Sequence, residues 1–258
     1  MYLPHEYGDR FHLLNDTYLL SLLARIGSPE TGIRGLPGLV RSAYRRLCSE
    51  VLAQEFPVVQ GRVNTRMTAS EPRAFYEGPL LCRNTKLIVV SVIRAGILPA
   101  QICYEIASEV VPTGHVRLDF LNISRTTDAE GHVTGVRLDG SKVGGPVDDA
   151  IVLIPDPMGA TGGTIEQVYK IYNSIDGGRP RKIVAMHLMV TPESIQSLQK
   201  NCPDTEIYAG RFDRGLSPAK ILDTIPGTHP DQERGLTEMQ YIVPGAGGMG
   251  ELLTNSWV

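Results

Sequence analysis

The sequence predicts an α/β fold with a doubly wound, mostly parallel sheet. Short apolar runs at 86–93, 151–154 and 182–190 have the continuous aliphatic character of strands buried on both faces of such a sheet. Strands of this kind alternate along the chain with segments that have helical spacing. The stretch AIVLIPDPMGATGGT, residues 150–164, joins one such strand to a glycine-containing turn and a helix. We therefore expect chemistry at that turn.

Composition favours one large domain, residues 1–258, and excludes several classes of partner. The chain is 42% hydrophobic, and its 25 basic and 28 acidic residues give a net charge of −3 without a long charged run. Neither nucleic acid nor a general polyanion is indicated as a partner.

The cysteines and the N-terminal residues indicate a compartment. Four cysteines lie far apart without CxxC spacing, which is typical of buried thiols in a reducing environment. No signal-peptide pattern and no apolar run of about 18 residues is present, so we expect a cytoplasmic protein without a membrane partner.

The N-terminal segment, about residues 1–55, is expected to hold two helices before any strand of the sheet. The first covers about 15–25, with Asn15 or Asp16 as N-cap. The second carries an apolar stripe over 39–52, which fits either the core or a subunit interface. Residues 55–77 look irregular and polar, and Val58, Val59 and Val63 hint at one short strand.

The strand at 86–93 ends in Arg94, Ala95 and Gly96 before a helix over about 98–110. Arg94 thus stands at the carboxyl end of its strand, as Asp156 does at the end of 151–154, and a parallel sheet brings such ends to one edge. The guanidinium is equally suited to bind phosphate oxygens or to pair with a neighbouring carboxylate.

A third strand is expected over 116–123, followed by a polar, glycine-containing segment over about 124–149. A connection of this length is usually a flexible lid or a β-ribbon. Its basic residues either close over an anionic substrate or are simply solvated; they are Arg125, Arg137 and Lys142.

The turn at 156–164 has the features of an anion site. Thr161, Gly162, Gly163 and Thr164 offer backbone N–H groups with little bulk at the start of a helix. The alternative is a tight turn that only links strand to helix, and Asp156 at the strand end favours the anion site.

The last third of the chain continues the alternation. A strand at 182–190 contains His187, which reads better as a core histidine than as a base, and Thr191 begins a helix that runs to about Lys200. A strand at 206–210 and a loop to Gln240 follow. The segment YIVPGAGGMG, 241–250, predicts a short strand and then a glycine run that lets backbone approach a flat ligand.

Three motifs together resemble the uracil phosphoribosyltransferase family in order and spacing: VIRAG (92–96), DPMGATGGT (156–164) and YIVPGAG (241–247). The resemblance covers nearly the whole chain and implies a type I phosphoribosyltransferase fold. It also implies transfer of phosphoribose from phosphoribosyl pyrophosphate (PRPP) to N1 of uracil, giving uridine monophosphate (UMP) and pyrophosphate in pyrimidine salvage.

The resemblance assigns roles to residues. Arg94, Arg125 and Asp156 would be catalytic, and Mg²⁺ would be held mainly by PRPP and water rather than by protein ligands. PRPP would contact Arg94, Ala95, Gly96, Arg125, Asp156, Pro157, Met158, Gly159, Ala160, Thr161, Gly162, Gly163, Thr164 and Gly248. Uracil would be bound by a C-terminal segment, about 241–258, through Tyr241, Ile242, Gly247, Gly248 and Met249.

The chain departs from the family pattern in its C-terminal motif. Family members typically continue YIVPGLGDAGDR, whereas this chain has Gly248 in place of the first Asp and Glu251 in place of the second. Gly159 and Ala246 each stand where leucine is usual. These departures keep two alternatives open, a PRPP- or nucleotide-binding regulator without turnover and a transferase for another base. The family likeness also suggests a homodimer or higher oligomer and a possible nucleotide effector.

Overall fold

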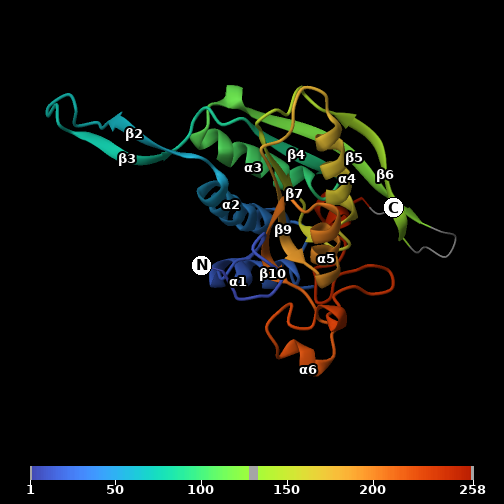
Figure 1. Cartoon of the computed structure of the whole chain (residues 1–258). Coiled ribbons are helices and arrows are strands. Elements are labelled where there is room, and N and C mark those ends of the chain that lie inside the picture. The colour runs from blue at the N-terminus through green and yellow to red at the C-terminus, as the bar shows by residue number, and fades with distance from the viewer. Residues whose placement is uncertain (1, 128–132, 257–258) are drawn as a thin grey trace.

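The computed structural model describes residues 2–127 and 133–256, and its centre is one large sheet (Figure 1). The strands of this sheet are β1 (Phe11–Leu13), β4 (Leu87–Ile93), β5 (Val116–Thr127), β6 (Val133–Lys142), β7 (Ile151–Pro155), β8 (Met158–Gly159), β9 (Lys182–Val190) and β10 (Thr205–Phe212). Their order is β1-β10-β9-β7-β4-β5-β6, with β8 beside β9. Every pairing is parallel except β5 with β6, so the predicted mostly parallel sheet is confirmed.

Helices cover both faces of the sheet. The helices of the described chain are α1 (Thr17–Ile26), α2 (Leu36–Glu55), α3 (Ile97–Val110), α4 (Gly163–Ser174), α5 (Pro192–Asn201), α6 (Ala219–Leu222) and α7 (Met249–Thr254), with 3-10 turns at Thr113–His115 and Pro230–Gln232. Leu87 and Val89 of β4 pack in the core with α1, α2 and α3, whereas Ile88 and Val90 pack in the core with α4 and α5. Burial on both faces explains the continuous aliphatic runs and confirms the doubly wound architecture.

The N-terminal helices form as predicted. Asp16 is the N-cap of α1 and accepts a hydrogen bond from the backbone N–H of Leu19 at 2.9 Å. The apolar stripe of α2 belongs to the core, since Leu47 and Val51 are fully buried. The expectation that both helices precede every strand is wrong, because β1 comes first and pairs with β10. A strand of three residues is too short for its periodicity to be recognised.

A second correction concerns the residues after α2. The segment expected to be irregular forms an antiparallel hairpin, β2 (Val58–Asn64) with β3 (Phe75–Leu81), which projects from the body of the molecule (Figure 1). Most side chains of β2 are exposed on both faces, so no alternation of polar and apolar residues reveals the strand. The guanidinium of Arg62 lies 3.4 Å from the ring centroid of Phe75 and ties the two strands together.

The predicted excursion at 124–149 is largely a β-ribbon. β5 continues past residue 123 to Thr127, and β6 returns antiparallel to it; residues 128–132 lie outside the described structure. Arg137 of β6 pairs with Asp139 at 2.6 Å, and Lys142 is exposed. Both side chains are exposed to solvent in this structure, and their closure over an anionic substrate stays a prediction.

The C-terminal segment departs from expectation in two ways. Residues 241–243 form no strand; an isolated bridge pairs Ile242 with Leu236, and the N–H of Val243 donates to the carbonyl of Gly235 at 2.8 Å. Helix α7 was not expected, because glycines at 248 and 250 lower helix propensity.

Two further properties bear on the sequence expectations. All four cysteines are free, and Cys48, Cys103 and Cys202 are buried. Within residues 2–127 and 133–256, no helix has the length and apolar character needed to cross a bilayer.

Candidate active site

A cavity of about 630 Å³ opens at the carboxyl edge of the sheet. Its walls come from the end of β4, the middle of β5, the turn after β7, the start of α4, and the C-terminal segment. The predicted residues that line it are Arg94, Ala95, Asp156, Met158, Gly159, Ala160, Thr161, Gly162, Thr164, Tyr241, Ile242, Gly247, Gly248 and Met249. The structure thus brings the three sequence motifs together around one space.

Some predicted residues contribute differently. Gly96, Pro157 and Gly163 belong to the same turns without lining the cavity. Gly96 allows a tight turn after β4, because a Cβ there would come within 2.7 Å of the carbonyl oxygen of Val92. Arg125 lies on β5 opposite Val136, and its side chain is outside the described part of the structure.

The turn between β7 and α4 forms one side of the cavity. Asp156 follows β7 directly, and its N–H donates to the carbonyl of Met186 at 3.1 Å. Gly162 is the N-cap of α4 with φ 85°, a left-handed conformation that glycine adopts without steric cost. The first-turn N–H groups of a helix have no partner within the helix, so this turn offers donors to an anion.

Arg94 lies across the cavity and is held by the C-terminal segment. Its Nη2 is 2.9 Å from Oε1 of Glu251, and its Nη1 donates to the carbonyl of Ser256 at 2.7 Å. In this structure Arg94 therefore follows the carboxylate alternative. Its side chain is 29% exposed, which leaves it accessible to a ligand entering the cavity.

His187 is a core histidine, as predicted, and it also lines the cavity. Burial lowers its pKa, so the ring is neutral near pH 7. Its Nδ1 lies 2.7 Å from the carbonyl oxygen of Asp156, and this acceptor requires the proton to be on Nδ1. Nε2 has no hydrogen-bond partner among the described residues. The ring fills space that Gly159 leaves open, since a Cβ at 159 would come within 2.9 Å of His187.

Sequence reasoning missed His187, Glu251, Asn122 and Ser124 as cavity residues. Asn122 lies near the end of the strand predicted at 116–123 and Ser124 directly follows it. Ligands of parallel sheets collect at such strand ends, so this position was an available signal. For His187 the available signal was Gly159, because a glycine where leucine is usual leaves space for another side chain.

The C-terminal side of the cavity depends on contacts with distant parts of the chain. Asp213, after β10, accepts a hydrogen bond from the N–H of Gly245 at 2.9 Å and is paired with Arg211. Glu193 of α5 accepts from the N–H of Gly235 at 2.9 Å. These carboxylates fix the backbone on both sides of Tyr241, which is 50% exposed, and Ile242, which is buried.

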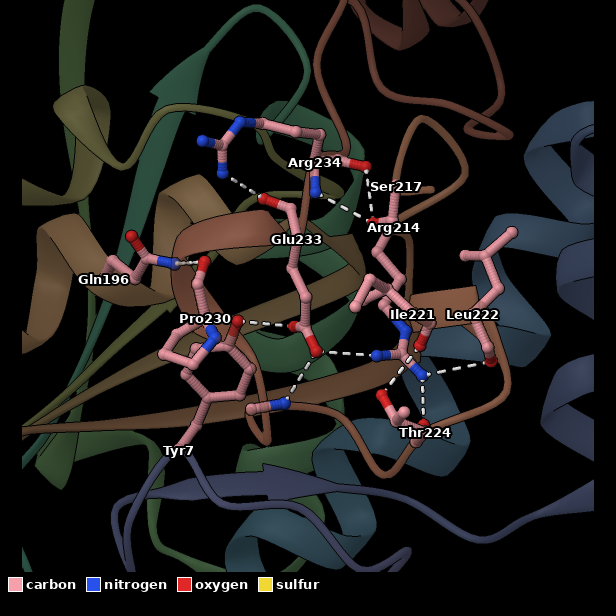
Figure 2. Close-up of polar contacts among 11 residues, drawn as sticks. Tyr7, Gln196, Arg214, Ser217, Ile221, Leu222, Thr224, Pro230, Glu233 and Arg234 are labelled. Carbon is pink, nitrogen blue, oxygen red and sulfur yellow. Dashed lines mark hydrogen bonds and ion pairs between the residues drawn. The ribbon is translucent and has the colours of Figure 1, made fainter. Parts of the chain in front are cut away.

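A buried polar cluster anchors the long connection between β10 and this segment (Figure 2). Glu233 is fully buried and accepts from Tyr7 Oη at 2.6 Å, from Arg214 Nη1 at 2.6 Å and from the N–H of Gly227 at 2.9 Å. Arg214 also donates to the carbonyls of Leu222 and Thr224. Burial and the neighbouring carboxylate raise the pKa of Tyr7, which keeps its hydroxyl a donor.

The fold and the cavity define a class of protein. An acid at the end of one strand, a glycine-containing turn into a helix after it and an arginine after the neighbouring strand are the arrangement of a type I phosphoribosyltransferase. A family model described as uracil phosphoribosyltransferase matches residues 13–229. The chain belongs to the uracil phosphoribosyltransferase family.

Individual relatives are distant. The chain is 29% identical over 169 residues to the uracil phosphoribosyltransferase of Aquifex aeolicus, and that match spans 65% of this chain and 64% of the relative. It is 27% identical to the uracil phosphoribosyltransferase of Pyrobaculum islandicum over 83% of this chain and 93% of the relative. A solved structure of a protein from Aquifex aeolicus shares the fold, with TM-score 0.72, 22% identity and coverage of 96% and 99% of the two chains.

Proposed function

We propose that the chain transfers phosphoribose from PRPP to N1 of uracil. The observation that carries the proposal is the meeting of the three motif segments around one cavity, with anion donors on one side and a backbone-lined, glycine-rich segment on the other. In the reaction the bond from C1 of the ribose to the pyrophosphate oxygen breaks and the bond from C1 to N1 forms. The proton of N1 passes to the departing pyrophosphate or to water.

The cavity residues would divide this work. The amides of residues 160–164 would hold the 5-phosphate, and Asp156 would accept hydrogen bonds from the ribose hydroxyls and favour the positive charge that develops on the sugar. Arg94 would leave Glu251 to bind the pyrophosphate. Backbone groups near Ile242, Gly247 and Met249 would read the base.

Magnesium fits this site. Mg²⁺ prefers oxygen ligands, and the cavity presents the carboxylates of Asp156 and Glu251 near the space for the phosphates. The ion would neutralise charge on the leaving pyrophosphate. The protein's contribution is to hold PRPP and orient its C1 toward the base.

The proposal is tested by incubating the protein with PRPP, Mg²⁺ and radiolabelled uracil. Labelled UMP that requires both PRPP and the metal is the expected result. No labelled nucleotide above a heat-inactivated control, at high enzyme concentration, would refute it.

A second candidate is a transferase for another base, and the pair Gly159 and His187 favours it. Nε2 of His187 has no hydrogen-bond partner within residues 2–127 and 133–256, and it adds a buried acceptor beside the cavity. Free bases that compete with labelled uracil separate the two candidates. A base that is a better substrate than uracil is itself consumed and lowers the amount of labelled UMP formed.

We also propose a homodimer or higher homo-oligomer. The projecting hairpin β2–β3 exposes apolar side chains, and exposed apolar surface of this kind marks an interface. The exposed apolar side chains of the hairpin are Val58, Val59, Val63, Met67 and Tyr76, and each is between 43% and 59% exposed. Light scattering after size exclusion should give at least twice the mass of 28.2 kDa, and a monomer at micromolar concentration would contradict the proposal.

A further inference from the structure

We propose that His187 is a positioning residue for Asp156. Its ring holds the peptide that carries the Asp156 carboxylate and so sets how that carboxylate meets the ribose of PRPP. The inference rests on the proposed function, because that function gives Asp156 its part in the reaction. It concerns a side chain of β9 that lies outside all three sequence motifs, beside a glycine at 159 where leucine is usual.

The main chain of Asp156 is bound by two consecutive residues of β9. Its N–H donates to the carbonyl of Met186 at 3.1 Å, and its carbonyl oxygen lies 2.7 Å from Nδ1 of His187. A carbonyl oxygen can only accept, so Nδ1 carries the proton and donates. Both polar groups of the Asp156 backbone are therefore fixed to one strand, which restricts the directions that its side chain can take.

This side-chain hydrogen bond occurs where the ladder between β7 and β9 becomes irregular. The two strands pair regularly up to Pro155 and Met186. In a regular parallel ladder the N–H of Leu188 would next donate to the carbonyl of Asp156. It donates instead to the carbonyl of Pro157 at 3.0 Å, and the Asp156 carbonyl accepts from the imidazole. The ring thus takes the place of a backbone donor at the start of the turn that lines the cavity.

The ring has space because residue 159 carries no side chain. A Cβ at Gly159 would lie 2.9 Å from Cγ of His187 and 3.0 Å from its Cδ2. The ring is fully buried, so moving it would disturb the packing around it. The carbonyl of Gly159 also accepts from the N–H of Thr191, the residue after β9, at 3.1 Å. Gly159 and His187 are therefore a matched pair that holds the turn from Asp156 to Gly159 against β9.

The two ring nitrogens predict how substitutions at 187 behave. Nδ1 makes the hydrogen bond to Asp156, whereas Nε2 has no partner among the residues that the structure describes. The amide nitrogen of asparagine is as many bonds from the backbone as Nδ1, and that of glutamine is one bond further out, as Nε2 is. Asparagine should therefore keep the hydrogen bond to Asp156, and glutamine should lose it.

A role for His187 in packing alone makes a different prediction. Leucine would then be the best replacement, because it is apolar and fills much of the space, and the smaller, polar asparagine would be the worst. The loss would appear in stability and would not depend on Asp156. If His187 positions Asp156, asparagine is better than leucine, and the effect on kcat disappears once the Asp156 carboxylate is removed.

The experiment measures kcat and both KM values for UMP formation by the full chain with Mg²⁺. His187→Leu should lower kcat by about tenfold to a hundredfold, because a small displacement of a reacting group is costly, and the KM for uracil should stay unchanged. His187→Asn should recover most of the loss, and His187→Gln should not. Val184→Ala, which shortens a buried side chain of β9 outside the cavity, is the matched control and should lower stability while kcat per folded molecule is unchanged.

A double-mutant cycle tests whether the effect passes through Asp156. In the Asp156→Asn background, His187→Leu should lower kcat by no more than about twofold further, since the group that it positions has lost its charge. Thermal unfolding checks that each variant is folded at the assay temperature. If His187→Leu does not fold, the comparison of His187→Asn with His187→Gln decides, and equal kcat values in these two variants would refute the inference.

The outcomes also separate this inference from the proposed function. If wild type forms UMP and His187→Leu keeps the wild-type kcat, or His187→Asn is no better than His187→Leu, the inference is overturned and the proposed function stands. A full further loss of kcat in the Asp156→Asn background has the same meaning. If wild type forms no UMP, both are overturned.

Discussion

The two sides of the cavity are built in different ways. The side proposed to bind phosphate, here called the phosphate side, is one continuous stretch, in which β7, the turn at 156–162 and α4 follow one another directly. The side proposed to bind the base, here called the base side, is the C-terminal segment. Asp213 holds this segment through the N–H of Gly245, and Glu193 and Glu233 hold the connection that leads to it through Gly235 and Gly227. A site made of consecutive residues keeps its geometry through local backbone preferences, whereas a site held by distant contacts depends on each anchor.

The departures from the family pattern are distributed unevenly between the two sides. Asp156 and the residues Ala160–Thr164 keep the family motif, whereas Ala246, Gly248 and Glu251 all fall in the C-terminal segment. Gly159 is the exception on the phosphate side, and it faces His187. Phosphate binding is thus expected to follow the family closely, and the residues proposed to contact the base and the metal are where this chain differs.

The largest expected effect comes from removing the anchor of the base side. Glu233→Ala leaves Arg214 buried without its carboxylate, which should cost about 3–5 kcal/mol of stability. Thermal unfolding measures this loss. In the folded fraction the KM for the base should rise more than the KM for PRPP; an equal rise in both would show that the anchor does not act on one side alone. Glu238→Gln, an exposed acid, is the control.

On the phosphate side, the second-largest effect is expected from a substitution that strains the backbone of the turn before α4. Gly162→Ala forces a side chain into a left-handed conformation, φ 85°, and brings its Cβ within 3.3 Å of Leu198 and Ser194. We expect a loss of about 1–3 kcal/mol in stability or PRPP binding. Calorimetry and thermal unfolding check it, with Gly114→Ala, where a Cβ meets nothing within 4 Å, as the control. Unchanged PRPP affinity and stability would mean that the turn tolerates a side chain.

Asp156→Asn tests whether the phosphate side also takes part in catalysis. The amide keeps the shape of the side chain and loses its negative charge, so PRPP binding should be partly retained. Turnover should fall by about tenfold or more, which corresponds to about 1.4 kcal/mol in the barrier. Initial rates at saturating substrates measure it. Wild-type turnover in this variant would remove Asp156 from the mechanism.

The smallest effect concerns His187 and pH. Its pKa in the folded protein is below the ordinary value of 6.5, so the unfolded chain binds a proton that the native ring does not. This contribution to stability is complete above pH 6.5 and declines as the pH falls below it. His187→Asn keeps a donor for the Asp156 carbonyl without titrating, so its stability should depend less on pH between about 8 and 5.5. The exposed His115, changed to Gln, is the control; equal slopes in all three proteins would exclude the effect.

The contrast between the two sides also explains what could be predicted from the sequence. The strands buried on both faces, the helices between them and the glycine-containing turn at 156–164 were predictable, because burial on two faces and helix starts leave local patterns. The short strand β1 and helix α7 were not. The hairpin β2–β3 was not, since its exposed strands show no alternation. Nor was the Glu233 cluster, because Tyr7 and Glu233 are 226 residues apart and no local pattern connects them.

The residues Arg94 and Glu251 mark the limit of such prediction. The position of Arg94 after β4 was predictable, and both of its possible partners were foreseen. Arg94 pairs with Glu251 in this structure because α7 places that side chain beside it. Helix α7 was hard to predict, since the glycines at 248 and 250 lower helix propensity.

A crystal structure of the chain with PRPP and Mg²⁺ tests the central claim most directly, namely that the two sides form one pocket for a phosphoribosyl donor and a base. We expect the 5-phosphate on the amides of residues 160–164 and the pyrophosphate on Arg94, with the 2.9 Å contact from Arg94 Nη2 to Glu251 Oε1 broken. PRPP bound elsewhere, or bound in the cavity with that ion pair intact, would contradict the account.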